Sequence, residues 1–182
     1  MKQVAGSTEC QVPSLQLVAE GCAPVPPQSL ARQIKLAIRR RLSPRQERAF
    51  KKRTNRLANW FRTIAGRDTL PSPAVVAGAP AAALQAGDRV RVRSRQEIQA
   101  TLDNWRQLKG CTFMPEMGEY CGTTQRVYRR MERFVDERDL RVKKVRGIVL
   151  LEGLRCQGTA EFGRCDRACL CFWREEWLEK IE

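Results

Sequence analysis

The chain has 182 residues, with 34 Lys and Arg against 20 Asp and Glu, so its formal net charge at neutral pH is +14. This length is enough for one ordinary domain with a hydrophobic core, plus short appendages. The excess of positive charge favours an anionic partner: nucleic acid, an acidic protein or an anionic membrane surface. The chain has no histidine, which excludes Ser-His-Asp and Cys-His catalytic arrangements and any metal site with histidine ligands. We therefore expect a binding role rather than an enzyme.

The first 27 residues contain four prolines and no run of seven or more apolar residues. A secretory signal needs such a run, so we expect none. No window of the chain approaches the ~18 consecutive apolar residues of a membrane-spanning helix. We therefore expect residues 1–27 to be disordered and the protein to be cytoplasmic, or at most peripheral to the inner face of the membrane. In that reducing compartment, clustered cysteines are more typical of metal ligands or redox thiols than of disulfides.

Residues 28–66 combine basic and apolar residues at helical spacing. Within residues 28–68, 13 Lys and Arg stand against two acids. Apolar residues recur every three or four positions through QSLARQIKLAIRRRL and PRQERAFKKRTNRLANWFRTIAG, which predicts two helices. Ser43 is expected to cap the second helix, with Gln46 bonding back to it and Pro44 in the first helical position. We therefore predict a basic helical hairpin or arm.

The second predicted helix has a basic side and an apolar side, which leaves three interpretations open. The apolar side packs on a neighbouring helix and the charges are solvated. Alternatively, the basic side binds nucleic acid phosphates or an acidic protein. In the third, the helix lies on an anionic membrane surface, with Trp60 and Phe61 as interfacial anchors. The residues predicted to contact an anionic partner are Arg39, Arg40, Arg41, Arg45, Arg48, Lys52, Arg56 and Arg62.

Residues 67–87 contain three prolines among small residues, a composition typical of a linker. The predicted globular domain therefore spans residues 88–182. Its first strand is RVRV, in which valine and arginine alternate after a Gly-Asp turn. The segment SRQEIQATLDNWRQLKG then predicts a helix, with Ser94 as its N-cap and Glu97 completing a capping box.

The remaining sequence is dominated by strand signals. GTTQRVYRRMERFVDERDLRV predicts two strands around a turn, and VRGIVLLEGLRC predicts a buried strand that ends at Cys156. CLCFW predicts a last short strand, and REEWLEKIE a closing helical turn. Short strands with one helix indicate an α+β fold, namely a small SH3-like β-barrel with one inserted helix.

Two resemblances bear on this domain. GDRVRVRS with FMPEMGEYCGTTQRV is similar to the barrel of nitrile hydratase β subunits, in which a GDRVRV strand precedes a Pro-x-Tyr-x-Gly turn. The corresponding residues here are Pro115, Tyr120 and Gly122, at a different spacing. This resemblance covers about 40 residues and implies an SH3-like barrel.

A wider block resembles an uncharacterised family of small bacterial cysteine-rich proteins with a basic helical N-terminal part. It includes FMPEM, YCGTTQRVYRRMERFVDERDLRVKKVRGIVLLEG, GRCDRAC and FWREEWLEKI, and the resemblance spans roughly residues 30–182. It implies a shared fold unit without an established activity. It also implies that the family's cysteines are Cys121, Cys156, Cys165 and Cys169. Members often have a further cysteine near the position of Val135 or Val145, which this chain lacks.

Four of the eight cysteines lie within residues 156–171, in the spacing Cys156-x8-Cys165-x3-Cys169-x-Cys171. Structural zinc takes four ligands, usually thiolates, and iron–sulfur clusters also take four. The preferred ligand set is Cys121, Cys156, Cys165 and Cys169, with Cys171 as a substitute. Zinc would staple the domain, because its binding energy is folding energy. Buried free cysteines, disulfides and redox thiols remain alternatives.

These observations predict a non-enzymatic, zinc-stapled binding or accessory module whose basic arm engages nucleic acid or an acidic protein. One alternative is a thiolate-metal or iron–sulfur accessory protein with a redox or catalytic role. Nitrile hydratase α subunits hold a metal in C-x-x-C-S-C, whereas C-D-R-A-C-L-C in this chain is one residue longer and lacks the serine. The other alternative is a peripheral membrane adaptor.

Overall fold

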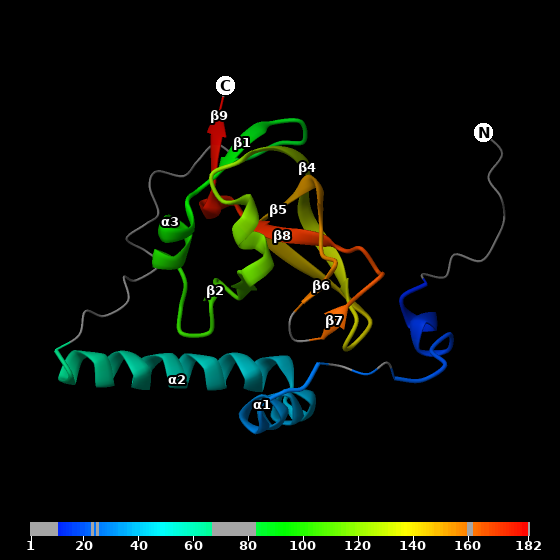
Figure 1. Cartoon of the computed structure of the whole chain (residues 1–182), viewed down its shortest axis with the longest axis vertical. Helices are drawn as coiled ribbons and strands as arrows, with labels where there is room; N and C mark the ends of the chain where they lie inside the picture. The colour runs from blue at the N-terminus through cyan, green and yellow to red at the C-terminus, as the bar shows by residue number, and fades with distance from the viewer. Residues whose placement is uncertain (1–10, 23, 25, 67–82, 160–161, 182) are drawn as a thin grey trace.

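The computed structural model describes residues 11–22, 24, 26–66, 83–159 and 162–181. A long helix lies along one side of a small sheet domain, and a shorter helix lies beside one end of it (Figure 1). Predicted disorder in residues 1–10 and the predicted linker over residues 67–82 lie outside the described residues. The elements in chain order are η1 (Pro13–Gln16), α1 (Leu30–Arg41), α2 (Pro44–Ile64), β1 (Arg89–Val92), α3 (Arg95–Ala100), β2 (Gln107–Leu108), β3 (Cys111–Thr112), η2 (Pro115–Tyr120), β4 (Thr124–Asp136), β5 (Arg141–Arg155), β6 (Gly158–Thr159), β7 (Gly163–Arg164), β8 (Leu170–Arg174), η3 (Glu175–Trp177) and β9 (Leu178–Ile181).

The two basic helices form where the sequence predicts them. The Ser43 N–H donates to Gln46 Oε1 at 2.9 Å, and the Gln46 N–H donates to Ser43 Oγ at 3.3 Å. Pro44 occupies the first helical position, where its missing N–H costs no helical hydrogen bond. This capping box separates α1 from α2 and confirms the predicted boundary between them.

The main sheet has five antiparallel strands in the order β8-β5-β4-β1-β9. This arrangement confirms the α+β class. No pairing joins β8 to β9 among the described strands, so the sheet is open and the predicted closed barrel is not formed. The register of β4 on β5 shifts between Val127 and Arg129 and again between Met131 and Arg133. Such bulges bend and twist a sheet, so β4 and β5 are curved although the sheet does not close into a barrel.

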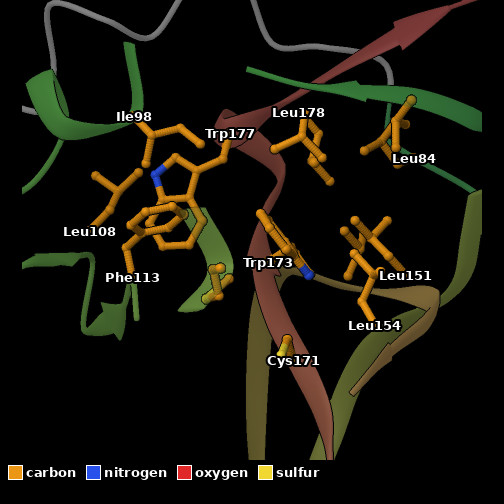
Figure 2. Packing of buried hydrophobic residues seen from close by; sticks show 14 of the residues in the cluster. Leu84, Ile98, Leu108, Phe113, Leu151, Leu154, Cys171, Trp173, Trp177 and Leu178 are labelled. Carbon is orange, nitrogen blue, oxygen red and sulfur yellow. The ribbon is translucent and has the colours of Figure 1, made fainter. Parts of the chain in front are cut away.

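The core packs against this sheet and includes two tryptophans, Trp173 and Trp177 (Figure 2). Trp173 of β8 and Trp177 of η3 are fully buried, and the Phe113 ring lies edge-on to Trp177 at 5.4 Å between centroids. The Trp177 Nε1–H donates to Thr101 Oγ1 at 3.0 Å, which satisfies the polar atom of the ring inside the core. Leu84 belongs to the same cluster, so the end of the predicted linker is part of the domain.

The predicted helix after Ser94 is shorter than expected. Its capping box forms, since the Ser94 N–H donates to Glu97 Oε2 at 2.8 Å and the Glu97 N–H donates to Ser94 Oγ at 3.2 Å. The helix nevertheless ends at Ala100, and the chain then makes turns instead of continuing to residue 110. The prediction of a long helix was therefore wrong beyond its first turn and a half.

Asp103 explains this early end. One of its carboxylate oxygens, Oδ1, accepts hydrogen bonds from the backbone N–H groups of Trp105 at 2.8 Å and Gln107 at 2.9 Å. An aspartate that bonds to the backbone two residues later favours a turn over a helix. Arg106 and Lys109 also have positive φ angles of 58° and 49°, which a right-handed helix does not allow.

The closing segment also differs from its prediction. REEWLEKIE was expected to be a helical turn, but only residues Glu175–Trp177 form a single 3-10 turn. Leu178–Ile181 is the strand β9, which pairs with β1. Trp177 and Leu178 are both buried, so packing on the core and pairing with β1 override the helical preference of the charged residues.

Candidate functional site

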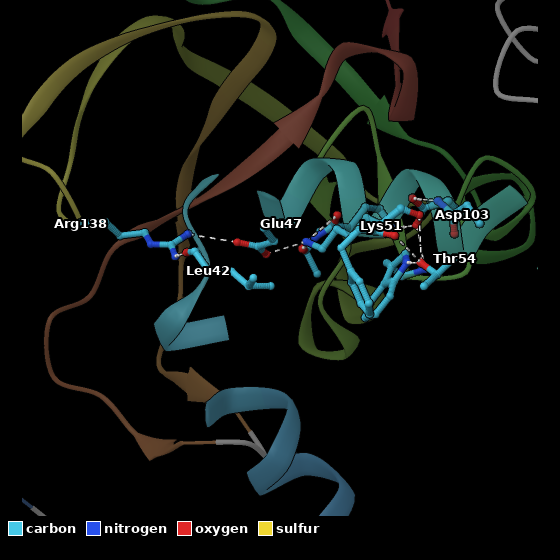
Figure 3. A network of polar contacts seen from close by, with 11 residues as sticks. Leu42, Glu47, Lys51, Thr54, Asp103 and Arg138 are labelled. Carbon is cyan, nitrogen blue, oxygen red and sulfur yellow. Dashed lines mark hydrogen bonds and ion pairs between the residues drawn. The ribbon is translucent and has the colours of Figure 1, made fainter. Parts of the chain in front are cut away.

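Helix α2 contacts the sheet domain through a polar face (Figure 3). The Asn55 side-chain amide donates to Asp103 Oδ2 at 3.0 Å, and Trp105 Nε1–H donates to Thr54 Oγ1 at 3.1 Å. Lys51 Nζ also donates to Gln107 Oε1 at 3.3 Å. Asp103 thus shapes the turn with one carboxylate oxygen and holds α2 with the other.

The first turn of α2 has a second contact with the domain. Arg138, in the turn between β4 and β5, donates to Glu47 Oε2 at 3.0 Å and to the Leu42 carbonyl at 2.9 Å. Glu47 also pairs with Lys51 at 2.9 Å. Because these contacts lie on the same side of the helix as Thr54 and Asn55, α2 is held along a polar stripe with a spacing of three to four residues.

The apolar side of α2 is left uncovered by this arrangement. Leu57, Trp60, Phe61 and Ile64 have exposed fractions of 56%, 57%, 61% and 64%. No residue of α2 is classed as buried among those that the structure describes. The interpretation in which this side packs on a neighbouring helix therefore does not hold for residues 57–64. A contiguous exposed stripe of large apolar side chains is typical of an interaction surface.

The basic side of α2 is also free. Arg45, Arg48, Lys52 and Arg56 are exposed, and in the described part of the chain none of them has a hydrogen bond or ion pair. They follow one another along the helix over roughly 16 Å, at 1.5 Å per residue. Of the other predicted contacts, Arg41 is exposed and Arg62 half-buried. The side chains of Arg39 and Arg40 lie outside the described part of the structure.

A groove of about 420 Å³ lies between α1, the start of α2 and the β2–β3 ribbon. Its apolar lining includes Ile34, Ile38 and Phe50, with Trp105 at the domain side. Lys35 Nζ lies 5.3 Å from the centroid of the Trp105 ring, a cation–π contact. Trp105 lies in the segment predicted to be a helix after Ser94, whereas the structure places it in a turn, where it contacts both α1 and α2.

The predicted metal ligands divide into two groups. The pairing of Arg155 with Leu170 continues to Cys156 and Cys169, since the Cys156 N–H donates to the Cys169 carbonyl at 2.7 Å. Cys156 and Cys169 therefore stand opposite one another where the two strands end. The Cys169 side chain is exposed, whereas that of Cys171 is buried.

The other two candidate ligands lie outside this strand pair. Cys165 is exposed and ends the β6–β7 hairpin, where its N–H donates to the Gln157 carbonyl at 3.1 Å. Cys121 follows η2, where burial raises the pKa of its thiol and the charge of Arg95 opposes the rise. Among the described residues, no three Cys, Asp or Glu side chains lie close enough to hold a metal ion together. The zinc and iron–sulfur hypotheses stay predictions.

A cavity of about 370 Å³ opens between η2 and the ends of β5 and β8. Its lining includes two cysteines, Cys156 and Cys171, and two methionines, Met114 and Met117. The pKa of the Cys171 thiol is raised to about 11, chiefly by burial and also by the neighbouring thiols of Cys156 and Cys169 and by nearby carboxylates. Sequence reasoning missed this cavity, because MPEM signals only a turn packed by thioethers.

Comparison with protein-family models, curated proteins and solved structures finds no significant match for this chain. The suggested family therefore stays a prediction. No helix in the described ranges is both long and apolar enough to cross a membrane.

Proposed function

We propose that this protein is a non-enzymatic binding module whose helix α2 engages an anionic partner. One observation supports the proposal above all others: α2 docks on the domain through Lys51, Thr54 and Asn55, and so keeps its basic side free. A helix that used its basic side to dock would have no charge left for a partner. The domain acts as a rigid support that presents this side to solvent.

The row of free cations suits a linear polyanion. Arg45, Arg48, Lys52 and Arg56 lie on one side of a continuous helix, and no acidic side chain follows Glu47 in α2. Contacts with phosphates release counterions, so nucleic acid binding through these four residues should weaken as the salt concentration rises. The slope of the logarithm of the binding constant against the logarithm of the salt concentration should be roughly −3.6. An acidic protein offers the same charge complementarity with a different geometry. We propose nucleic acid as the first partner to test.

The test is fluorescence anisotropy of a labelled DNA duplex over a range of KCl concentrations. The double variant Arg48→Gln with Lys52→Gln should flatten the slope by roughly 1.8, since two phosphate contacts are lost. Arg89→Gln with Lys144→Gln is the matched control, because both residues are exposed strand cations outside α2. An equal loss in the control would mean that net charge alone drives binding and would contradict the role of α2.

A second candidate function, a peripheral membrane adaptor, is favoured by the exposed stripe of Leu57, Trp60, Phe61 and Ile64. Helices that lie in a membrane interface combine Lys and Arg with Trp, Phe and Leu on the other side. Each large side chain that enters the apolar layer contributes about 1.5–3 kcal/mol. The same stripe gains little from the phosphate backbone of a nucleic acid duplex.

Sedimentation with vesicles separates the two candidates. An adaptor should bind vesicles that contain phosphatidylserine and not vesicles of phosphatidylcholine alone. Trp60→Ser with Phe61→Ser should abolish this binding and leave DNA binding unchanged. Tyr128→Ser with Phe172→Ser, a pair of exposed aromatic residues outside α2, serves as control. Failure to bind anionic vesicles would eliminate the adaptor and leave the polyanion proposal standing.

We also propose that the domain is SH3-like. In support, the strands follow the order β9-β1-β4-β5-β8, with β4, β5 and β8 forming a meander. The 3-10 turn η3 lies between β8 and β9 and leads the last strand back to β1. Helix α3, the β2–β3 ribbon and η2 occupy the long connection between β1 and β4, which places Trp105 against α2.

A further inference from the structure

The cavity between η2 and the β5–β8 pair concentrates sulfur. Met114 and Met117 come from the start of η2, and Cys156 and Cys171 come from the strand ends that face it. Met117 is almost fully buried, and its sulfur accepts the Met114 N–H at 3.4 Å. The cavity volume of about 370 Å³ is several times the ~30 Å³ share of a water molecule, so an ion and its ligands have room.

The cavity is also locally anionic in a strongly basic chain. Glu116 and Glu119 belong to its lining, and Arg155 is the basic residue in the same lining. The Arg155 guanidinium is engaged with the Ala168 carbonyl at 3.3 Å. A cation that enters this cavity would therefore meet two carboxylates beside the two thiols.

The donor types discriminate between metals. Zinc is held by Cys, His, Asp or Glu, and the described residues bring no three of these side chains together around one point. Thiolate and thioether ligands together favour monovalent copper. In this cavity, two thiols and two thioethers line one volume.

We propose that this cavity is a binding site for monovalent copper, with Cys156 and Cys171 as thiolate ligands and Met114 as a thioether ligand. Binding replaces each S–H proton by a Cu–S bond and releases that proton to solvent, with no change in the oxidation state of copper. Cys121 and Cys165, which the sequence placed in a zinc set, take no part. The site is independent of the partner-binding role of α2.

The experiment titrates the reduced, full-length chain with Cu⁺ under anaerobic conditions, in competition with a chromophoric Cu⁺ chelator. The wild-type protein should take up one ion per chain. Loss of an outer-shell partner alone costs about 10–100-fold in metal affinity, so Cys156→Ser and Cys171→Ser should each weaken binding at least about tenfold. Cys111→Ser and Cys121→Ser are the matched controls and should bind as the wild type does.

Folding is checked by the near-ultraviolet circular dichroism of the buried tryptophans. If Cys171→Ser fails to fold, Met114→Leu keeps the proposal testable, since it conserves volume and removes only the thioether. Met114→Leu should fold and bind Cu⁺ more weakly. Unchanged Cu⁺ affinity in Cys156→Ser and Met114→Leu would overturn the proposal. Tight Zn²⁺ binding that is lost in Cys121→Ser would also overturn it, and would restore the ligand set predicted from the sequence.

Discussion

The Nε1–H of Trp105 donates a hydrogen bond to Thr54 Oγ1 at 3.1 Å, and this bond joins the turn after α3 to the middle of helix α2. The two residues are separated by the whole of the Pro/Ala-rich segment. Asn55 and Asp103 form a second bond beside this contact, one residue from Thr54 and two residues from Trp105. Together they determine which side of α2 faces the domain, and hence which sides remain free.

Removing the Thr54 acceptor should loosen α2. Thr54→Val keeps the shape of the side chain and leaves Trp105 Nε1 without its partner, which should cost the docked state about 1–3 kcal/mol. Amide hydrogen exchange should then speed up along α2 and stay unchanged in the main sheet. Thr63→Val is the control, since the Thr63 hydroxyl donates to the Asn59 carbonyl inside the helix. Equal exchange in both variants would show that this bond does not hold the helix.

Leu84 tests where the domain begins. Its side chain is 2% exposed and packs in the core, although it lies in the segment predicted to be a linker. Leu84→Ala should lower the free energy of unfolding by about 2–5 kcal/mol, because it removes buried methyl groups and leaves a cavity. Urea denaturation measures this change. Ala83→Gly next to it, at an exposed position, should change stability far less. If Leu84→Ala lowers the free energy of unfolding by less than about 1 kcal/mol, Leu84 is not part of the core and belongs to the linker.

Glu176 should make stability depend on pH in the acid range. Burial works to raise its pKa, but hydrogen bonds from Arg174 and Lys109 outweigh it and lower the pKa from 4.5 to about 2. Since the folded pKa is depressed, the stabilisation is complete above pH 4.5 and is lost as the pH falls towards 2. Because the side chain is a quarter exposed, we expect the effect to be on the order of 1 kcal/mol.

The check on this prediction is urea denaturation between pH 5 and pH 2 for the wild type and Glu176→Gln. The variant should lose less stability over that interval, since it has no carboxylate to protonate. Glu179→Gln is the control, because Glu179 pairs with Arg91 at an exposed position. Parallel curves for the wild type and Glu176→Gln would contradict the assignment of the lowered pKa to the Arg174 and Lys109 contacts.

The cysteines should differ in their reaction with iodoacetamide at neutral pH. Burial raises the pKa of Cys111 and Cys171 to about 11, so both stay protonated and shielded. Cys22, Cys165 and Cys169 are exposed and should be alkylated first. Mass spectrometry of peptides at successive times gives the order, and labelling in denaturant supplies the reference. Early labelling of Cys171 in the folded chain would refute its buried position.

Local signals predicted the helices well where their ends are marked. Ser43 and Ser94 each start a helix with the expected capping box, because this interaction involves only four consecutive residues. The end of α3 was predicted wrongly because the apolar spacing of Leu102, Trp105 and Leu108 suits a helix. The carboxylate of Asp103 and the contact of Trp105 with α2 decide otherwise, and neither can be read from spacing.

The candidate sites show the same division. Their spacing alone marked Cys156, Cys165, Cys169 and Cys171 as one candidate group. That Cys156 stands opposite Cys169 depends on the register of β5 on β8, and register depends on the whole sheet. The placement of Cys121 beside Arg95, and of Met114 beside Cys171, follows from how η2 packs on the core.

The sequence by itself determined the two basic helices, their charge, the α+β class and most of the strands, because capping, periodicity and charge are properties of neighbouring residues. Only the tertiary structure decided that the polar side of α2 docks, while its basic side and the apolar residues between 57 and 64 stay exposed. It also decided that Cys156 stands opposite Cys169 and lines a cavity together with Cys171. Both outcomes depend on contacts between residues far apart in the chain, where hydrogen-bond partners and strand register are chosen by the packing of the whole domain.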